Sequence, residues 1–243
     1  YEIAKRFNAR NSSVYNLLVN NDIDIRPKAI YNVNHNFFSK IDNEAKAWIL
    51  GLMYTDGNIV KDENRIRLYS TDIDILEKSQ KLLEYTGKLY RINKNNKINK
   101  KPLYELSISS KQLKQDLIKN GCMPNKTFQL SFPSKEILPQ NLIRHFVRGL
   151  IEGDGTVSNY CAITGIKPLL EGVDNICKNE LNIKFYWYQR HPERNNNIYS
   201  LSLTKKCYIK VFLDWIYKDS QYFMKRKHDK YLEFFKDNPE ITT

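Results

Sequence analysis

Two stretches of the chain repeat one pattern of apolar positions. The apolar residues are Ala45, Trp48, Ile49, Leu52 and Met53 in the first stretch and Ile143, Phe146, Val147, Leu150 and Ile151, each 98 residues further on, in the second. Spacings of three and four residues place each set on one face of a helix. The repetition predicts two equivalent helices that each bury an apolar stripe.

Each predicted helix contains a glycine and ends on an acid at matched positions. Gly51 aligns with Gly149, and Asp56 aligns with Asp154. A glycine inside a helix costs about 0.5–1 kcal/mol relative to alanine, so its presence at one matched position suggests close backbone contact between the two helices. If the helices pack side by side in one direction, both aspartates reach the same end. A single Asp-Gly pair would indicate only a helix stop, and the duplication favours a shared site.

Two carboxylates at neighbouring helix C-termini repel each other and the partial negative charge of the exposed carbonyl groups. A divalent cation with oxygen ligands removes this repulsion, and Mg²⁺ usually keeps positions for water and for substrate phosphate. The predicted pair of acids therefore points to metal-assisted hydrolysis of a phosphodiester bond.

The chain after each acid shows the same order of elements. After Asp56 the pattern predicts a strand at 65–70, a helix at 72–85, a hairpin of 88–93 with 103–109, and a helix at 111–120. After Asp154 it predicts a short paired region to 162, a helix at 167–180, a hairpin of 185–190 with 198–204, and helices beyond 205. Each half reads helix, two strands, helix, two strands, helix. The expected fold is α+β, with halves at 44–138 and 139–243.

The charge of the chain favours a nucleic-acid partner. Lys and Arg number 39 against 27 Asp and Glu, which leaves a net charge of +12. Alternation along the predicted strands gathers polar and aromatic side chains on one sheet face, where they can read base edges. A solvated sheet face would show the same alternation. The residues expected to contact DNA are Arg65, Arg67, Tyr69, Ser107, Ser109, Tyr186, Tyr188, Arg190, Ser200, Ser202 and Thr204, with Lys94, Lys97 and Arg194 at two hairpin tips.

The first 27 residues differ from the rest of the chain. A short helix at 2–7, a turn at 8–10 and a second helix to about residue 20 resemble the helix-turn-helix modules of DNA-binding proteins. An ordinary helical hairpin would give the same pattern. The shared core expected between the two helices consists of Ile3, Ala4, Phe7, Val14, Leu17 and Leu18. Residues 28–43, which follow Arg26-Pro27 and are rich in asparagine, are expected to form a linker.

The spacing of the cysteines and the lengths of the apolar stretches argue against a zinc-binding or membrane-spanning protein. The four cysteines have no zinc-knuckle spacing and are expected to be reduced thiols. No apolar stretch approaches the ~18 residues of a membrane span, and no signal peptide opens the chain. We expect a soluble intracellular protein, whether in bacterial or phage-infected cytoplasm or in an organelle.

The two helical segments resemble the paired motifs of the LAGLIDADG homing endonucleases. Residues 49–57 and 147–155 each match the nine-letter signature. Tyr54 and Glu152 occupy its first acidic position, and Leu50 and Arg148 replace its usual alanine. The last acid and the following glycine are intact in both copies.

The resemblance implies two αββαββα halves joined through the paired helices, with antiparallel sheets that form a DNA-binding saddle in a monomer. It implies that Asp56 and Asp154 are catalytic and bind Mg²⁺, or Mn²⁺ or Ca²⁺ in its place, with the carbonyls of Thr55 and Gly153 as further ligands. It also implies an active-site lysine in each half. Lys126 is the choice in the first half and Lys227 in the second, where Lys225 has a nearly equal offset from the acid.

The activity implied is that of a sequence-specific double-strand DNA endonuclease with a long asymmetric target. Three alternatives stay open at the level of sequence. An RNA maturase would assist group I intron splicing and bind intron RNA. A cleavage-inactive DNA-binding regulator could use the same fold, although it would have little reason to keep both acids. An endonuclease domain of an intein would be expected to show splicing blocks, and no convincing ones are visible.

Overall fold

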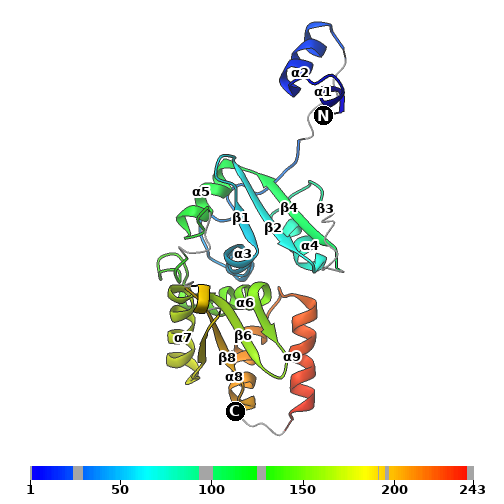
Figure 1. Cartoon of the computed structure of the whole chain (residues 1–243). Coiled ribbons are helices and arrows are strands. Elements are labelled where there is room, and N and C mark those ends of the chain that lie inside the picture. The colour runs from blue at the N-terminus through cyan, green and yellow to red at the C-terminus, as the bar shows by residue number, and fades with distance from the viewer. Residues whose placement is uncertain are drawn as a thin grey trace. The chain divides into compact units, whose positions relative to one another are not determined.

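The computed structural model describes residues 2–23, 30–92, 101–124, 130–190, 192–194 and 197–239. The chain divides into two compact units, residues 1–31 and residues 32–243. Figure 1 shows the elements of each. Among the described residues, every helix is too short or too polar to cross a bilayer.

The N-terminal unit contains α1 (Glu2–Arg6) and α2 (Asn11–Asn20). The core predicted for it is wrong at three of its six positions. Ala4 is buried, but Phe7 is 71% exposed and Leu17 is 63% exposed, and Ile3 is also exposed. Helices of five and ten residues carry too few side chains to enclose an apolar cluster between them.

The larger unit consists of two halves with the same order of elements. The first half contains α3 (Glu44–Thr55), β1 (Gly57–Ile59), β2 (Arg65–Ser70), α4 (Ile73–Leu82), β3 (Tyr90–Ile92), β4 (Leu103–Ser109) and α5 (Lys111–Lys119). The second contains η2 (Gln140–Leu142), α6 (Ile143–Asp154), β5 (Gly155–Val157), β6 (Cys161–Ile166), α7 (Lys167–Leu181), β7 (Tyr186–Gln189), η3 (Pro192–Arg194), β8 (Ile198–Leu203), α8 (Lys206–Tyr217) and α9 (Lys225–Asp237). This confirms the predicted α+β fold of two αββαββα halves.

Each half has a four-stranded antiparallel sheet with the same topology. The strand orders are β1-β2-β4-β3 and β5-β6-β8-β7. In the first sheet Arg67 lies opposite Ser107, and in the second Thr164 lies opposite Ser200. Burial alternates strictly along β2, so Ile66 and Leu68 face the core while the residues between them face the other side of the sheet.

The helices α3 and α6 lie side by side at the centre of the larger unit, between the two sheets (Figure 1). Helix α3 begins where the Asn43 side chain accepts a hydrogen bond from the Lys46 backbone N–H, 3.1 Å away. Nearly every residue of both helices is buried, because each helix packs against its own sheet and against the other helix.

Candidate functional site

The central helices touch through their backbones at the two matched glycines. A Cβ added to Gly51 would lie 2.9 Å from the Cα of Gly149 and would clash with the carbonyl oxygen of Phe146. A Cβ added to Gly149 would clash in the same way with the carbonyl oxygen of Trp48. Only glycine therefore allows this separation of the helices at either position.

The helices are still in contact where they end. A Cβ added to Gly153 would overlap the Thr55 side chain, whose hydroxyl donates to the carbonyl of Leu52 at 3.1 Å. Asp56 follows α3 as its C-cap, and its backbone N–H donates to Leu52 at 2.9 Å. Asp154 is the last residue of α6. Both acids thus leave the helix pair at one end, where Asp56 is half-buried and Asp154 is exposed.

The departures from the signature are explained by burial between the halves. The Tyr54 hydroxyl donates to the carbonyl of Asn120 at 2.8 Å, and its ring meets Phe146 edge to face at 5.0 Å. At the equivalent place in the other half, the indole N–H of Trp48 donates to Glu152 Oε2 at 2.6 Å. Burial raises the pKa of Glu152 to about 7, although the Trp48 hydrogen bond opposes the shift. Tyr54 and Glu152, which occupy the first acidic position of the two signatures, therefore pack in the interior.

Lys227 lies beside the end of α6. Its side-chain nitrogen donates to the carbonyl oxygens of Ile151, Glu152 and Gly155 at 2.6, 2.7 and 2.7 Å, and the residue is only 4% exposed. Burial, and next the charge of neighbouring Arg226, lowers the pKa of Lys227 to about 8, and the nearby carboxylates partly offset this. A cation at this helix C-terminus counters the partial negative charge of its carbonyl groups.

The other predicted active-site lysines are placed differently. Lys225 lies on the outside of α9, where it pairs with Asp229 at 2.7 Å and its side chain is largely exposed. Lys126 lies outside the described residues, as do Lys94 and Lys97. Of the two alternatives in the second half, only Lys227 contacts the helix that carries an acid.

The predicted DNA-contacting residues of the first half share one sheet face. Arg67 Nε lies 3.4 Å from Glu105, and Arg67 Nη1 lies 3.4 Å from the Tyr69 hydroxyl. The hydrogen bond with Tyr69, together with the nearby acids, raises the pKa of the Arg67 guanidinium. Arg65 pairs with Glu63 at 3.0 Å. Ser107 and Ser109 lie opposite Arg67 and Arg65 on the neighbouring strand.

The corresponding face of the second sheet is aromatic and hydroxylic. Tyr188, which is 64% exposed, lies opposite Ser200, and Tyr186 lies opposite Ser202. Ser200 is buried, whereas Thr204 is exposed just beyond β8. Further predicted residues lie near this sheet: Arg190 follows β7, and Arg194 belongs to η3.

Sequence reasoning missed Thr164, which shares the second sheet's outer face with Ser200 and lies 3.4 Å from Arg190 Nη1. The strand β6 does not alternate clearly, because apolar residues occupy positions on both of its faces. The pairing of β6 with β8 in the structure is what places Thr164 on this face.

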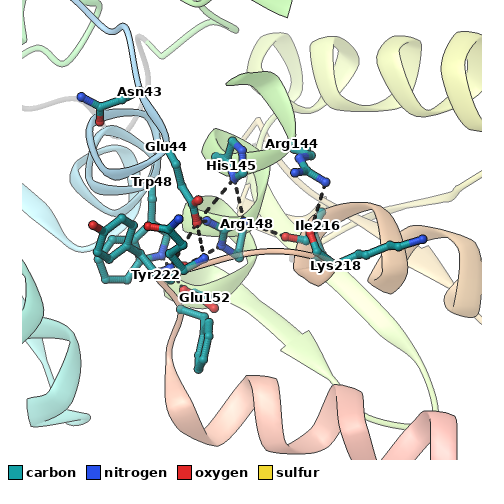
Figure 2. A network of polar contacts seen from close by, with 12 residues as sticks. Asn43, Glu44, Trp48, Arg144, His145, Arg148, Glu152, Ile216, Lys218 and Tyr222 are labelled. Atoms are coloured by element: carbon teal, nitrogen blue, oxygen red, sulfur yellow. Dashed lines mark hydrogen bonds and ion pairs between the residues drawn. The ribbon is translucent and has the colours of Figure 1, made fainter. Parts of the chain in front are cut away.

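A buried polar network at the other end of the helix pair was also missed (Figure 2). Arg148, which is fully buried, donates to Glu44 Oε1 at 2.6 Å and to His145 Nδ1 at 2.9 Å. It also donates to the backbone carbonyls of Ile216 and Tyr222 at 2.7 and 2.8 Å. The signal in the sequence was an arginine at the position of Leu50 in a helix expected to be buried, because a buried arginine needs an acid as its partner.

This network predicts a dependence of stability on pH. Burial, and next the Arg148 charge, lowers the pKa of His145 to about 4, below its ordinary value of 6.5. The unfolded chain therefore binds more protons between these pH values, and the free energy of unfolding falls as the pH drops from about 6.5 to 4. We expect the loss from His145 to be about 2–3 kcal/mol.

The variant His145→Asn isolates this effect, because an asparagine oxygen can accept from Arg148 but does not titrate. Urea unfolding at a series of pH values is expected to give a flatter stability curve for the variant than for the wild type. Parallel curves for the two proteins would contradict the assignment to His145.

Comparisons with known proteins agree with this architecture. The family model described as LAGLIDADG-like domain matches residues 43–120 and 141–217, which together make up more than half of the chain. The chain belongs to the LAGLIDADG-like domain family. The two matched ranges contain the paired helices α3 and α6, which confirms the resemblance seen in the two signatures. No curated protein matches this LAGLIDADG chain significantly in sequence.

Solved structures share the LAGLIDADG fold at low sequence identity. The homing endonuclease I-WcaI bound to its DNA recognition sequence has a TM-score of 0.58 and 11% identity, over 81% of this chain and 90% of that one. I-DmoI in complex with DNA and Mn has a TM-score of 0.50 and 20% identity, over 73% and 98%. Full-length DUF199/WhiA from Thermatoga maritima has a TM-score of 0.52 and 13% identity. The match covers 86% of this chain but only 66% of the length of the WhiA chain.

Proposed function

We propose that the protein is a sequence-specific endonuclease that hydrolyses both strands of double-stranded DNA with divalent metal ions, Mg²⁺ first. The observation that carries the proposal is that Asp56 and Asp154 leave two touching helices at the same end, beside a buried lysine. Two carboxylates at one end of a helix pair repel each other, and this repulsion favours a bound divalent cation. The DNA-bound relatives, one of them with Mn, support the same conclusion through the shared fold.

The donor chemistry of this site fits Mg²⁺. No cluster of three or more His, Cys, Asp or Glu residues able to hold a metal occurs in the described parts of the chain. Mg²⁺ is usually held by one or two carboxylates, with waters and substrate phosphate completing its shell. Asp56 and Asp154 would hold it, with the carbonyls of Thr55 and Gly153. When bound, the metal would activate water and neutralise charge on the phosphate.

The chain's own residues have three tasks in this proposal. The glycine contact sets the spacing of the two acids, because it fixes the separation of their helices. Lys227 holds the carbonyls at the end of α6. The sheet faces would position the duplex, with Arg65 and Arg67 on one half and tyrosines and hydroxyls on the other. Unlike faces on the two halves imply an asymmetric target read by a single chain.

The N-terminal unit would extend the DNA contacts. Its described surface exposes Lys5, Arg6 and Arg10, which are suited to phosphate. We propose that it acts as a helix-turn-helix-like DNA-binding segment that is joined to the nuclease through a linker.

Cleavage of randomised DNA tests the proposed function. The protein is incubated with a library of random duplexes and Mg²⁺, and the cut ends are sequenced. We expect one long asymmetric sequence to be cut on both strands, with no cleavage in EDTA because the acids then have no metal. Specific binding without cleavage would overturn the proposal in favour of a DNA-binding regulator. Binding to a group I intron RNA without cutting DNA would overturn it in favour of a maturase.

A further inference from the structure

The segment between α8 and α9 of the second half is held by side chains of the first half. We call this contact the cross-half clasp: it joins Glu44, Asp72, Asp74 and Lys78 of the first half to residues 221–226 of the second. Asp72 is the N-cap residue of α4, and Asp74 and Lys78 lie on that helix. Glu44 begins α3.

Charged groups make most of the contacts in the clasp. Glu44 Oε1 accepts the backbone N–H groups of Gln221 and Tyr222 at 2.8 and 3.1 Å, in addition to Arg148. The Asp72 carboxylate accepts two hydrogen bonds from the Arg226 guanidinium, at 3.0 and 2.9 Å. Such charge-assisted and bidentate hydrogen bonds are stronger and more directional than neutral ones.

Helix α4 adds contacts to the start of α9. Asp74 Oδ2 accepts the backbone N–H of Lys225 at 3.0 Å. Lys78 donates to the carbonyl of Phe223 at 2.5 Å, and its nitrogen lies 4.9 Å from the centre of the Phe223 ring. The clasp therefore fixes the backbone on both sides of the point where α9 begins.

The clasp leads directly to the end of α6. Lys227 lies in the first turn of α9, next to Arg226, and its three N–H donors match the carbonyls of Ile151, Glu152 and Gly155. These carbonyls lie on both sides of Asp154. Lys227 thus positions Asp154 through the backbone carbonyls on both sides of it. The clasp in turn positions Lys227, because Arg226 is the preceding residue.

Two of the clasp residues, Asp72 and Glu44, have apolar residues at the equivalent positions of the other half. The N-cap of α7 is Ile166, where α4 has Asp72. The residue equivalent to Glu44 in the repeat of the central helices is Leu142. Neither apolar side chain can form the ion pairs that Asp72 and Glu44 form.

We propose that Glu44, Asp72 and Arg226 are positioning residues through which the first half sets the Asp154 end of the active site. This inference rests on the proposed function for its effect on cleavage. Weakening the clasp is expected to slow the cut that depends on Asp154 more than the cut that depends on Asp56, and so to convert the enzyme toward a nickase.

Strand-resolved cleavage of an end-labelled target duplex tests the effect. The variants are Asp72→Asn, Arg226→Gln and the two combined, with Asp229→Asn as the matched control, because Asp229 forms its ion pair with Lys225 on the same helix. We expect each clasp variant to slow one strand about tenfold relative to the other, with little further loss in the double variant. Duplex affinity in EDTA and the Asp229→Asn strand ratio should stay at wild-type values. Equal slowing of both strands, or an unchanged ratio, would overturn the proposal.

Hydrogen exchange separates failure of the clasp from failure of the proposed nuclease. In metal-free protein, Asp72→Asn is expected to speed amide exchange about tenfold at 151–157 and 225–229, while Asp229→Asn leaves residues 151–157 unchanged. Unaltered exchange at 151–157 in Asp72→Asn would overturn the positioning role whether or not the wild type cuts DNA. A wild type that cuts neither strand, with faster exchange in Asp72→Asn, would refute the nuclease and support the clasp.

Discussion

Asp56→Asn and Asp154→Asn are each expected to abolish double-strand cleavage, with the affected strand cut about 10³-fold more slowly. Asparagine keeps the size and shape of the side chain but removes the charge that would hold a divalent cation at the helix ends. Loss of one metal-binding carboxylate should remove stabilisation that exists only in the transition state, and so lower the rate constant without lowering affinity. Each single variant is expected to nick the duplex on the strand served by the other acid.

Binding should survive these substitutions. The removal of a negative charge near the DNA backbone reduces repulsion, so affinity measured in EDTA should be equal or higher than in the wild type. Asp237→Asn, at the exposed end of α9, is the matched control and should cut both strands normally. Wild-type cleavage of both strands by Asp56→Asn or Asp154→Asn would rule out the proposed roles.

Gly51→Ala is expected to destabilise the larger unit by about 2–4 kcal/mol, because the new methyl group meets backbone atoms on the facing helix. Backbone cannot rotate away as a flexible side chain can, so α3 and α6 must separate along their length. The same result is expected for Gly149→Ala. Urea unfolding followed by circular dichroism measures the loss as a lower midpoint.

Gly165→Ala provides the matched control for this substitution. A Cβ at Gly165 would meet the Leu170 side chain at 3.4 Å, an ordinary contact distance. Its cost should be below about 1 kcal/mol. If Gly51→Ala proved as mild as Gly165→Ala, the close approach of the two central helices would be refuted.

The sequence predicted the centre of the molecule better than its periphery. The duplicated pattern of apolar residues and glycines specifies two similar helices, and alternation along 65–70 matches β2 because only one face of that strand is buried. The family match and the fold confirm these inferences. Side-chain pairs that join the two central helices, such as Trp48 with Glu152, depend on tertiary geometry and could not be predicted from the spacing of residues in the sequence.

The misjudged features share a physical cause. Arg148 departs from the signature, and its spacing does not reveal its partner. The acid that pairs with it, Glu44, is distant in sequence and lies in the other half. The N-terminal helices showed helical periodicity, but periodicity reports only which face would be buried and not whether enough chain is present to bury it. Exposed Phe7 shows the difference.

The unlike pairs across the central helices restrict how the two halves can combine. Tyr54 packs on Phe146, whereas at the equivalent place Glu152 bonds to Trp48. Two copies of the second half would set each Glu152 against Phe146, which leaves a buried carboxylate without a donor. Two copies of the first half would crowd Tyr54 against Trp48. Each half is thus a specific partner of the other, and a symmetric dimer could not be recovered by cutting this chain in two.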